Sequence, residues 1–483
     1  MKQITIDPIT RLEGHGKIDI FLDDQGNVAN AYMVIPELRG FEKFCEGRKA
    51  EDLPIITTRI CGVCPVAHHF ASAKALDAAF HVEPPPTAKK LRELMYSGYI
   101  IYDHILHFYF LGGPDFVVGP DAPAAERNIL GVIKKVGLDV GKEVIKHRAY
   151  GQRITAILGG KATHPACGIP GGISKALSEE DRQEIEKMAK SCVEFSKSTL
   201  ALFDQVVLKN ADYVDMIKSD AYSMRTYYMG TVDRDNKVNF YDGVVRVVDP
   251  QGHEFTRFTP NEYLDVIEER VEPWTYVKFP YLKKVGWKGF VDGAESGVYR
   301  VGPLGRLNAS EGMATPLAQE EFERMYRTLG KPVHSTLAFH WARLIELLYA
   351  SERAMELALD SEITGKDVRN PVGVPGEGVG IVEAARGTLI HHYVLDEDAL
   401  AKKVNLIVAT TNNSAAIDMS VRDAAKGVIK NGVVDEGLLN KVEMAFRAYD
   451  PCMACATHFA VGQMPLEVRI FDAKRRLIQV ICS

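Results

Sequence analysis

The sequence predicts a mainly α-helical, multidomain α+β protein with β structure at its periphery, and three observations support this fold class. The chain has 483 residues, which is long enough to bury a large core and to form more than one structural unit. Apolar residues make up 46% and charged residues 25% of the chain, a composition typical of an ordered globular protein. Helical periodicity dominates the middle of the chain, whereas period-two alternation occurs near both ends and in one internal segment.

The N-terminal segment, residues 1–50, is predicted to be rich in β structure. Lys17–Leu22 and Val28–Ile35 alternate in polarity and flank the turn sequence Asp23-Asp24-Gln25-Gly26-Asn27, a pattern that predicts a β-hairpin. Residues 51–209 then form a predicted helical core. Its clearest helix, Thr87–Leu111, lies between Pro84-Pro85-Pro86 and Gly112-Gly113-Pro114, residues that favour the start and the end of a helix.

In the second half of the chain, a predicted β-rich segment is again followed by a predicted helical segment. In residues 210–310, short β-rich runs such as Val238–Val248 alternate with turns, which predicts a β-rich subdomain. Residues 311–458 predict a second helical core, with helices from Pro316 to Ser361, a glycine-rich loop at Gly373–Gly387, and further helices up to Tyr449. The C-terminal extension, residues 459–483, alternates like a hairpin around Asp472-Ala473-Lys474.

Charge and hydropathy argue against two kinds of partner. The formal net charge of -6 is small for this length and gives no reason to expect nucleic-acid binding. No run reaches the roughly 18 apolar residues that a membrane-spanning helix needs, since the best candidate, Tyr99–Leu111, contains Asp103, His104 and His107. The N-terminus lacks the apolar centre of a secretion signal, so we expect a cytoplasmic protein, unless a partner subunit carries an export signal for both.

Eight cysteines are scattered along the chain, and four of them form two CxxC pairs. The pairs are Cys61 with Cys64 and Cys452 with Cys455. Two intervening residues let both thiolates turn toward one ion, and four thiolates make a soft site suited to zinc, nickel or iron–sulfur chemistry. The other four have no motif, and we interpret them as structural thiols: Cys45, Cys167, Cys192 and Cys482.

Spacing alone leaves the chemistry of the two pairs open. A structural zinc site is the simplest alternative, but zinc ribbons place their pairs within tens of residues, whereas most of this chain separates Cys64 from Cys452. A site that joins opposite ends of a large chain is expected to lie deep in the fold, which suits catalysis. A redox-active thiol pair is less favoured, because neither pair follows a thioredoxin-like unit.

The two motifs resemble the signatures of nickel–iron hydrogenase large subunits. The first reads Arg-Ile-Cys-Gly-Val-Cys and is followed by His68; the second reads Asp-Pro-Cys-Met-Ala-Cys-Ala-Thr-His and ends at His458. The resemblance covers nearly the whole chain and is greatest to the cytosolic, multi-subunit group. Further matches lie in the same order as in the family: Arg11-Leu12-Glu13-Gly14-His15, Arg39-Gly40-Phe41-Glu42, Asp103-His104, His164-Pro165, Pro170-Gly171-Gly172 and Glu383-Ala384-Ala385-Arg386-Gly387.

The resemblance implies a nickel–iron centre in the nickel–iron hydrogenase large-subunit fold. By position, Cys61 and Cys452 are similar to terminal nickel ligands, and Cys64 and Cys455 are similar to thiolates that bridge nickel to iron. The family's iron carries carbon monoxide and cyanide ligands. Thr410 is similar to a residue that hydrogen-bonds the cyanide, although Ala409 stands where many members have proline.

The resemblance also implies a set of residues around the metals. Glu13 is similar to the family's proton-transfer carboxylate and Arg386 to the arginine over the open face of the metals, accompanied by Asp103 and Asp450. From the residues alone, the alternative for Glu13 is a structural partner of Arg11 or of a backbone amide, and the alternative for Arg386 is an ordinary buried ion pair. Other residues have implied roles beside the centre: His68 donates to a bridging thiolate, Glu42 and His458 bind magnesium or iron near the C-terminus, and His164 faces a partner's iron–sulfur cluster.

The function implied by the resemblance is reversible, heterolytic cleavage of dihydrogen. The chain has too few spare cysteines for its own iron–sulfur clusters, so an iron–sulfur small subunit is an obligate partner. Flavin or iron–sulfur subunits coupled to NAD, ferredoxin or a heterodisulfide would follow, and a maturation endopeptidase would remove residues 459–483. Two alternatives are a homologous subunit of a respiratory quinone reductase, which should lack the four cysteines, and a zinc-stabilised interaction protein.

Overall fold

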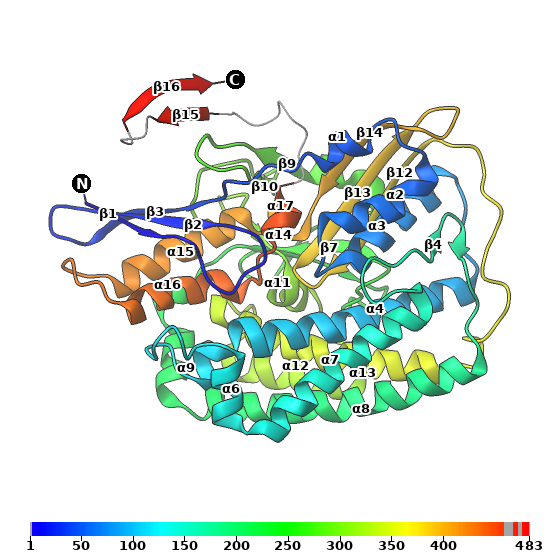
Figure 1. The fold of residues 1–483 in the computed structure, drawn as a ribbon, viewed down its shortest axis with the longest axis horizontal. Helices are drawn as coiled ribbons and strands as arrows, with labels where there is room; N and C mark the ends of the chain where they lie inside the picture. Colours follow the sequence, from blue (N-terminus) through cyan, green and yellow to red (C-terminus); the bar gives the residue numbers. More distant parts are fainter. Residues whose placement is uncertain (1, 458–466, 472–475, 483) are drawn as a thin grey trace.

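The computed structural model describes residues 2–457, 467–471 and 476–482. At the N-terminus, β1 (Lys2–Ile6), β2 (Lys17–Leu22) and β3 (Val28–Val34) form an antiparallel sheet in the order β1-β2-β3. The predicted hairpin is therefore confirmed, with its second strand one residue shorter than expected. Figure 1 shows this sheet extending from one side of the molecule, above α15 (Ser414–Val428), against which β3 packs.

Four long helices lie side by side and form the helical layer at the bottom of Figure 1. They are α4 (Pro86–Leu106), α7 (Leu138–Gly159), α8 (Glu179–Phe203) and α13 (Phe339–Leu359). The predicted helix Thr87–Leu111 corresponds to α4 and the π-helical turn η3 (His107–Gly112) that continues it. Pro86 occupies the first helical position of α4, where a missing backbone N–H costs nothing. Most of the second half of α4 is buried, so it is a central helix.

Shorter helices and helical turns connect these four long helices to the rest of the fold. The α-helices among them are α1 (Phe41–Cys45), α2 (Leu53–Ile56), α3 (Pro65–Ala79), α5 (Pro114–Val117), α6 (Ile129–Val136), α9 (Ala211–Lys218), α10 (Tyr263–Val266), α11 (Gly302–Ala309), α12 (Pro316–Leu329), α14 (Ala409–Asn412), α16 (Glu436–Ala448) and α17 (Met453–Ala456). The 3-10 and π turns are η1 (Ala50–Asp52), η2 (Thr57–Ile60), η4 (Asp204–Leu208), η5 (Asp220–Tyr222), η6 (Pro260–Glu262) and η7 (Thr336–Ala338).

The internal β structure falls into separate small sheets. Strands β6 (Tyr227–Val232), β7 (Val244–Val248), β8 (Glu254–Phe258) and β11 (Tyr299–Arg300) form a sheet in the order β11-β6-β7-β8. The two-stranded sheets are β4 (Gly168–Ile169) with β5 (Gly172–Ile173) and β9 (Ile267–Arg270) with β10 (Phe279–Leu282). These small sheets are combined with a largely helical body, so the predicted fold class is confirmed.

The prediction was wrong for the segment around the glycine-rich run. Residues 377–407 form an antiparallel sheet of β12 (Glu377–Ala384), β13 (Gly387–Leu395) and β14 (Ala401–Ile407) instead of a loop followed by helices. Almost every residue of β12 and β13 is buried, so the polar–apolar alternation that reveals a half-exposed strand is missing from the sequence.

The glycines of this run serve close packing between a strand and a helix. A Cβ atom at Gly378 would lie 2.2 Å from the backbone nitrogen of Ala79, and one at Gly380 would lie 2.2 Å from the carbonyl oxygen of Ala71. Both partners belong to α3, the helix that follows the first CxxC pair. Glycine thus lets β12 approach α3 more closely than any other residue would permit.

The C-terminal extension contributes one further hairpin to the described residues. Strands β15 (Glu467–Phe471) and β16 (Leu477–Cys482) pair antiparallel, as the alternation predicted; the expected turn at Asp472-Ala473-Lys474 lies outside the described residues. Among the described helices, none has both the length and the apolar composition required to cross a lipid bilayer.

Candidate metal centre

Four cysteine thiols from opposite ends of the chain meet in one buried cluster. The sulfur atoms of Cys61, Cys64, Cys452 and Cys455 all lie within 4.8 Å of one another, and each residue is at most 4% exposed. Cys61 Sγ is 3.3 Å from Cys452 Sγ, and Cys64 Sγ is 3.3 Å from Cys455 Sγ. Each contact joins one motif to the other, so the cluster exists only in the folded chain.

Local helix geometry turns each pair inward. Cys61 directly follows η2, and Cys64 precedes Pro65, the first residue of α3. Cys452 precedes α17 and Cys455 lies within it. Hydrogen bonds from the other three thiols lower the pKa of Cys61 well below its usual range, whereas burial raises the pKa of Cys452. A soft cation at this cluster would stabilise ionisation of all four thiols.

Arg39 joins the backbones of the two cysteine segments. Its guanidinium donates to the carbonyl oxygens of Ile60 and Arg59 beside the first motif, and to that of Ala454 in the second at 3.2 Å. Its backbone N–H also donates to the carbonyl of Thr457 at 2.6 Å. The family motif Arg39-Gly40-Phe41-Glu42 did not imply a role for the Arg39 side chain. Only the structure shows that its planar guanidinium donates hydrogen bonds to both cysteine segments.

Glu13 touches the cluster directly. Its Oε2 accepts hydrogen bonds from the Cys452 thiol at 2.9 Å and from the backbone N–H of Ala454 at 3.0 Å. Burial raises the pKa of Glu13 and negative charge on Cys61 raises it further, although the two hydrogen bonds oppose the shift. A carboxyl group with a raised pKa beside a thiol is suited to exchanging protons with it near neutral pH.

Arg386 lies in the tight turn between β12 and β13 and is held by two carboxylates. Its two terminal nitrogens each donate to Asp103 at 3.1 Å, and Nη2 is 3.0 Å from Oδ2 of Asp450. Its Nε also donates to the backbone carbonyl of Asp450 at 2.8 Å. Burial by itself lowers the pKa of Arg386, but Asp103 and Asp450 outweigh it and raise the pKa well above its ordinary value. The guanidinium is therefore a fixed, buried positive charge.

A second buried arginine supports the turn that carries Arg386. Arg306 donates to the carbonyl oxygens of Ala384 at 2.7 Å and Ala385 at 3.3 Å, immediately before Arg386. It also forms ion pairs with Glu346 and Glu383 at 2.5 and 2.9 Å. All three charged side chains are fully buried. No sequence motif predicted this network, since Arg306 is a lone arginine in Gly302–Ala309.

The structure places the other predicted residues as follows. Nε2 of His68 is 3.5 Å from Cys455 Sγ. Thr410 Oγ1 accepts a hydrogen bond from the backbone N–H of Cys452 at 3.0 Å. Glu42 is buried and accepts from the N–H of Leu406 at 2.7 Å, while its expected companion His458 lies outside the described residues. His164 has Nδ1 3.0 Å from the carbonyl of Thr58, close to the first motif.

A neighbouring threonine adds a further polar group. The hydroxyl oxygen of Thr411 is buried and has no hydrogen-bond partner among the described residues. Thr411 lies in α14, which packs against α17, the helix of the second motif. A buried hydroxyl without a partner costs free energy, so Thr411 is a second candidate for bonding a group that binds here.

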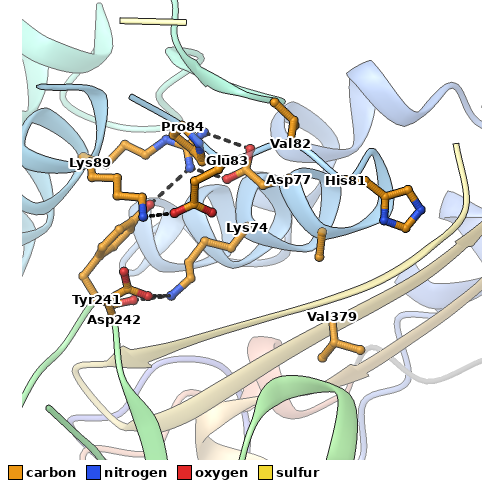
Figure 2. Close-up of a pocket in the computed structure, with 12 residues that line it drawn as sticks. Lys74, Asp77, His81, Val82, Glu83, Pro84, Lys89, Tyr241, Asp242 and Val379 are labelled. Carbon is orange, nitrogen blue, oxygen red and sulfur yellow. Dashed lines mark hydrogen bonds and ion pairs between the residues drawn. The ribbon is translucent and has the colours of Figure 1, made fainter. Parts of the chain in front are cut away.

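A charged surface pocket lies away from this cluster. It has a volume of about 410 Å³ and includes Lys74 and Asp77, near the end of α3 opposite Cys64. Figure 2 shows oppositely charged side chains of the pocket pointing toward one another. Lys74 pairs with Asp242 at 3.1 Å, and Asp77 with Arg92 at 2.6 Å. Since these charges are paired, the pocket offers no comparable set of metal ligands.

Comparison with known proteins agrees with this arrangement. The model of the nickel-dependent hydrogenase family matches residues 39–129 and 142–458, which include both cysteine pairs. The chain belongs to the nickel-dependent hydrogenase family. A second model, described as HoxL-like, matches residues 3–38. The chain is therefore the catalytic large subunit of a nickel–iron hydrogenase, and the quinone-reductase and zinc-protein alternatives are no longer needed.

Individual relatives cover the chain almost completely. An F420-non-reducing hydrogenase iron-sulfur subunit from Archaeoglobus profundus is 51% identical, with 100% of this chain and 99% of the relative covered. NAD-reducing hydrogenase HoxS subunit beta of Cupriavidus necator is 40% identical, with 99% of each covered. The structure of an NAD+-reducing [NiFe]-hydrogenase in the H2-reduced state has a TM-score of 0.89 at 39% identity, with 95% of this chain and 100% of that chain covered.

Proposed function

We propose that Cys61, Cys64, Cys452 and Cys455 hold the nickel and iron of this hydrogenase, with Cys61 and Cys452 on nickel alone and Cys64 and Cys455 between the two metals. The observation that carries the assignment is the convergence of four buried thiols within 4.8 Å. Thiolates are the soft ligands that nickel and low-spin iron favour. When bound, the metals supply the Lewis acidity that makes dihydrogen acidic at neutral pH.

The protein's own groups then move the proton and balance charge. Cys452 Sγ and Glu13 Oε2 are 2.9 Å apart, so a proton on this sulfur can pass to the carboxylate without a bridging water. Arg386, fixed by Asp103 and Asp450, holds a positive charge beside the cluster, where it balances the thiolates electrostatically. The paired hydrogen bonds to Asp103 keep the orientation of the Arg386 guanidinium constant throughout turnover.

Further parts of the site extend the same proposal. Thr410 or Thr411 would donate a hydrogen bond to a cyanide ligand of iron, which the family resemblance implies together with carbon monoxide. Glu42 and His458 bind magnesium or iron, because a buried carboxylate is a suitable ligand for a hard cation. Both assignments rest on the resemblance to the family and on the burial of Glu42 and Thr411 in the structure.

The partners follow from the electron count. Oxidation of dihydrogen releases two electrons, and the described residues contain one cluster of metal-binding residues, the four thiols. We infer that an iron–sulfur small subunit receives the electrons near His164 and that the complex works in the cytoplasm. Its acceptor is coupled to NAD, ferredoxin or a heterodisulfide; the relatives from Archaeoglobus and Cupriavidus are named as F420-non-reducing and NAD-reducing enzymes.

Replacing one ligand tests the assignment. Cys61→Ser should abolish both nickel retention and hydrogen oxidation, because a hydroxyl is a hard, weak substitute for a thiolate. The matched control is Cys192→Ser, a buried thiol outside the cluster. Elemental analysis of the purified complex gives nickel and iron per chain, and infrared spectroscopy gives the carbon monoxide and cyanide bands. Normal nickel content and full activity in Cys61→Ser would refute the ligand assignment.

Removal of the C-terminal extension is a separate part of the proposal. The family match ends at residue 458, where a maturation endopeptidase would cut after His458 once nickel is loaded. Intact-mass measurement of active complex should therefore show a chain that ends at or within one residue of His458. A nickel-loaded, fully active chain that retains Ser483 would show that activity does not require the cut.

A further inference from the structure

A buried two-residue hairpin turn carries Arg386. Strands β12 and β13 pair as far as Ala384 and Gly387, so Ala385 and Arg386 make the turn. A Cβ atom at Gly387, where φ is 139°, would lie 2.1 Å from a side-chain carbon of Val301, which shows how tightly the turn is packed. Both turn residues are buried, so their backbone polar groups must find partners within the protein.

Side chains from three other parts of the fold supply these partners. The N–H of Ala385 donates to the Tyr99 hydroxyl at 3.1 Å, and the carbonyl oxygen of Ala385 accepts from Arg306 at 3.3 Å. The carbonyl oxygen of Arg386 accepts from the side-chain amide of Asn413 at 3.3 Å. Each of the three peptide groups between residues 384 and 387 is therefore bonded by a side chain from elsewhere in the fold.

One face of α4 contacts both the backbone of the turn and the Arg386 guanidinium. Tyr99 and Asp103 are four residues apart on α4 and therefore share a face of the helix. Tyr99 bonds the backbone just before Arg386, and Asp103 accepts from both terminal nitrogens of the guanidinium at 3.1 Å. Tyr96 extends this face and donates to the carbonyl oxygen of Glu383 at 3.0 Å. The helix thus fixes both ends of the Arg386 side chain.

Asn413 fixes the other side of the turn. It lies between α14 and α15, and its Oδ1 accepts from the backbone N–H of Val301 at 2.9 Å. This bond identifies the oxygen of the amide and leaves the nitrogen to donate to the carbonyl of Arg386. Tyr99 and Asn413 are both buried, so neither exchanges its partner in the turn for bulk water.

We propose that Tyr99 and Asn413 are positioning residues of the hydrogenase reaction: they bond the turn backbone on either side of Arg386 and so hold its guanidinium against Asp103 in one orientation. Both residues act on the site through Arg386. A functional group is held precisely when the residues around it are themselves fixed by packing and hydrogen bonds. The inference rests on the proposed role of Arg386 in balancing the charge of the thiolates.

The crystal structure of the Tyr99→Phe complex tests the geometry directly. Phenylalanine keeps the ring and removes only the acceptor of a buried N–H, a loss that favours movement of the turn. The expected structure shows the turn displaced and at least one of the two hydrogen bonds between Arg386 and Asp103 lost. An Arg386 side chain that keeps both bonds at their wild-type lengths would overturn the proposal. Nickel and iron at the four sulfurs of the same crystal report separately on the ligand assignment.

A double-mutant cycle tests whether Tyr99 acts through Arg386. Tyr99→Phe should lower the rate of hydrogen oxidation about fivefold at unchanged nickel and iron content, because a misplaced guanidinium stabilises developing charge less well. In the Arg386→Lys background, the same change should lower the rate by less than about 1.5-fold, since the planar group that Tyr99 positions is already gone. A further fivefold loss in that background would show that Tyr99 acts independently and would overturn its assignment.

Asn413→Ala passes through the same cycle and keeps the proposal testable if Tyr99→Phe does not fold. It should also lower turnover in the wild-type background alone, and additive losses would remove Asn413 from the proposal. Full turnover in Arg386→Lys by itself would refute the proposed role of Arg386 and, with it, the inference. Failure of the inference alone is recognised because Arg386→Lys still loses turnover.

Tyr109→Phe is the matched control for Tyr99→Phe. Tyr109 lies in η3, which continues α4, and its buried hydroxyl contacts that of Thr199 at 2.9 Å. A purely structural effect of losing a buried phenol should be equal in both variants. The proposal requires comparable losses of thermal stability but a loss of turnover only in Tyr99→Phe. Equal losses of turnover in the two variants would overturn it.

Discussion

Glu13 owes its chemistry to its neighbours rather than to its own type. An exposed glutamate is ionised at neutral pH, but burial and the negative charge on Cys61 raise the pKa of Glu13. Hydrogen bonds from Cys452 and Ala454 hold the same carboxylate in place. The fixed position and the raised pKa together make Glu13 the group that we expect to exchange protons with the cluster.

Glu13→Gln tests this role without removing the ligands. Glutamine keeps the shape of the side chain but cannot carry a proton between sites. Nickel content should stay normal while exchange between dihydrogen and deuterated water falls at least about tenfold, roughly 1.4 kcal/mol of barrier. Mass spectrometry of the gas phase measures the exchange. Wild-type exchange in a fully metallated Glu13→Gln complex would assign the proton to another carrier.

Arg386 offers a second test at the scale of a single side chain. Its two contacts of 3.1 Å to Asp103 require a planar fork, which lysine cannot reproduce. Arg386→Lys should retain both metals and lose at least about tenfold in turnover, again roughly 1.4 kcal/mol. Steady-state hydrogen oxidation with elemental analysis of the same sample checks this. A loss below about threefold would mean that positive charge alone suffices.

At the scale of elements, one buried carboxylate joins the N-terminal sheet to the helical body. Asp418 on α15 accepts a hydrogen bond from the backbone N–H of Met33 on β3 at 2.6 Å. Burial raises its pKa from 3.8 to about 7. Between these values the unfolded chain has released this proton while the native state keeps it. The contribution of Asp418 to stability therefore falls as pH rises from about 4 to 7 and is constant above that range.

Asp418→Asn should remove this pH dependence. Asparagine keeps an oxygen acceptor for Met33 and has no charge to bury. The melting temperature of the variant relative to the wild type should rise steadily from pH 4.5 to pH 7.5, by several degrees in total. Calorimetry across that range measures the trend, with Asp265→Asn, an exposed aspartate, as the control. A difference independent of pH would show that Asp418 titrates normally.

At the scale of the whole molecule, Arg39 holds together segments that lie far apart in the sequence. It bonds the backbone at Ile60 and at Ala454, and therefore keeps the two cysteine pairs within reach of one cluster. A clamp of this kind should slow the local opening through which a buried metal escapes. Interactions confined to one motif cannot do this for both pairs.

Arg39→Gln should therefore shorten metal retention without destroying the site. We expect nickel loss to a chelator at least about threefold faster than from the wild type, because glutamine cannot bridge both segments. Arg48→Gln, which removes another arginine bonded to a backbone carbonyl, that of Phe44, is the control. Timed elemental analysis after adding the chelator follows the loss. Equal rates in both variants would remove Arg39 from this role.

The sequence by itself determined the chemistry and the outline of this protein. The CxxC spacing shows which sulfurs can share an ion, and the period-two runs at Lys17–Leu22 and Val28–Ile35 predict a hairpin, because both features depend on neighbours a few residues apart. The tertiary structure decided the contacts between residues that are far apart in the sequence. These are the contact of Cys61 with Cys452, the ion pair of Arg386 with Asp103, the hydrogen bonds of Arg39 to both cysteine segments and the contact of His68 with His391. It also decided that residues 377–395 are strands, since burial of both faces erases the alternation that would have revealed them.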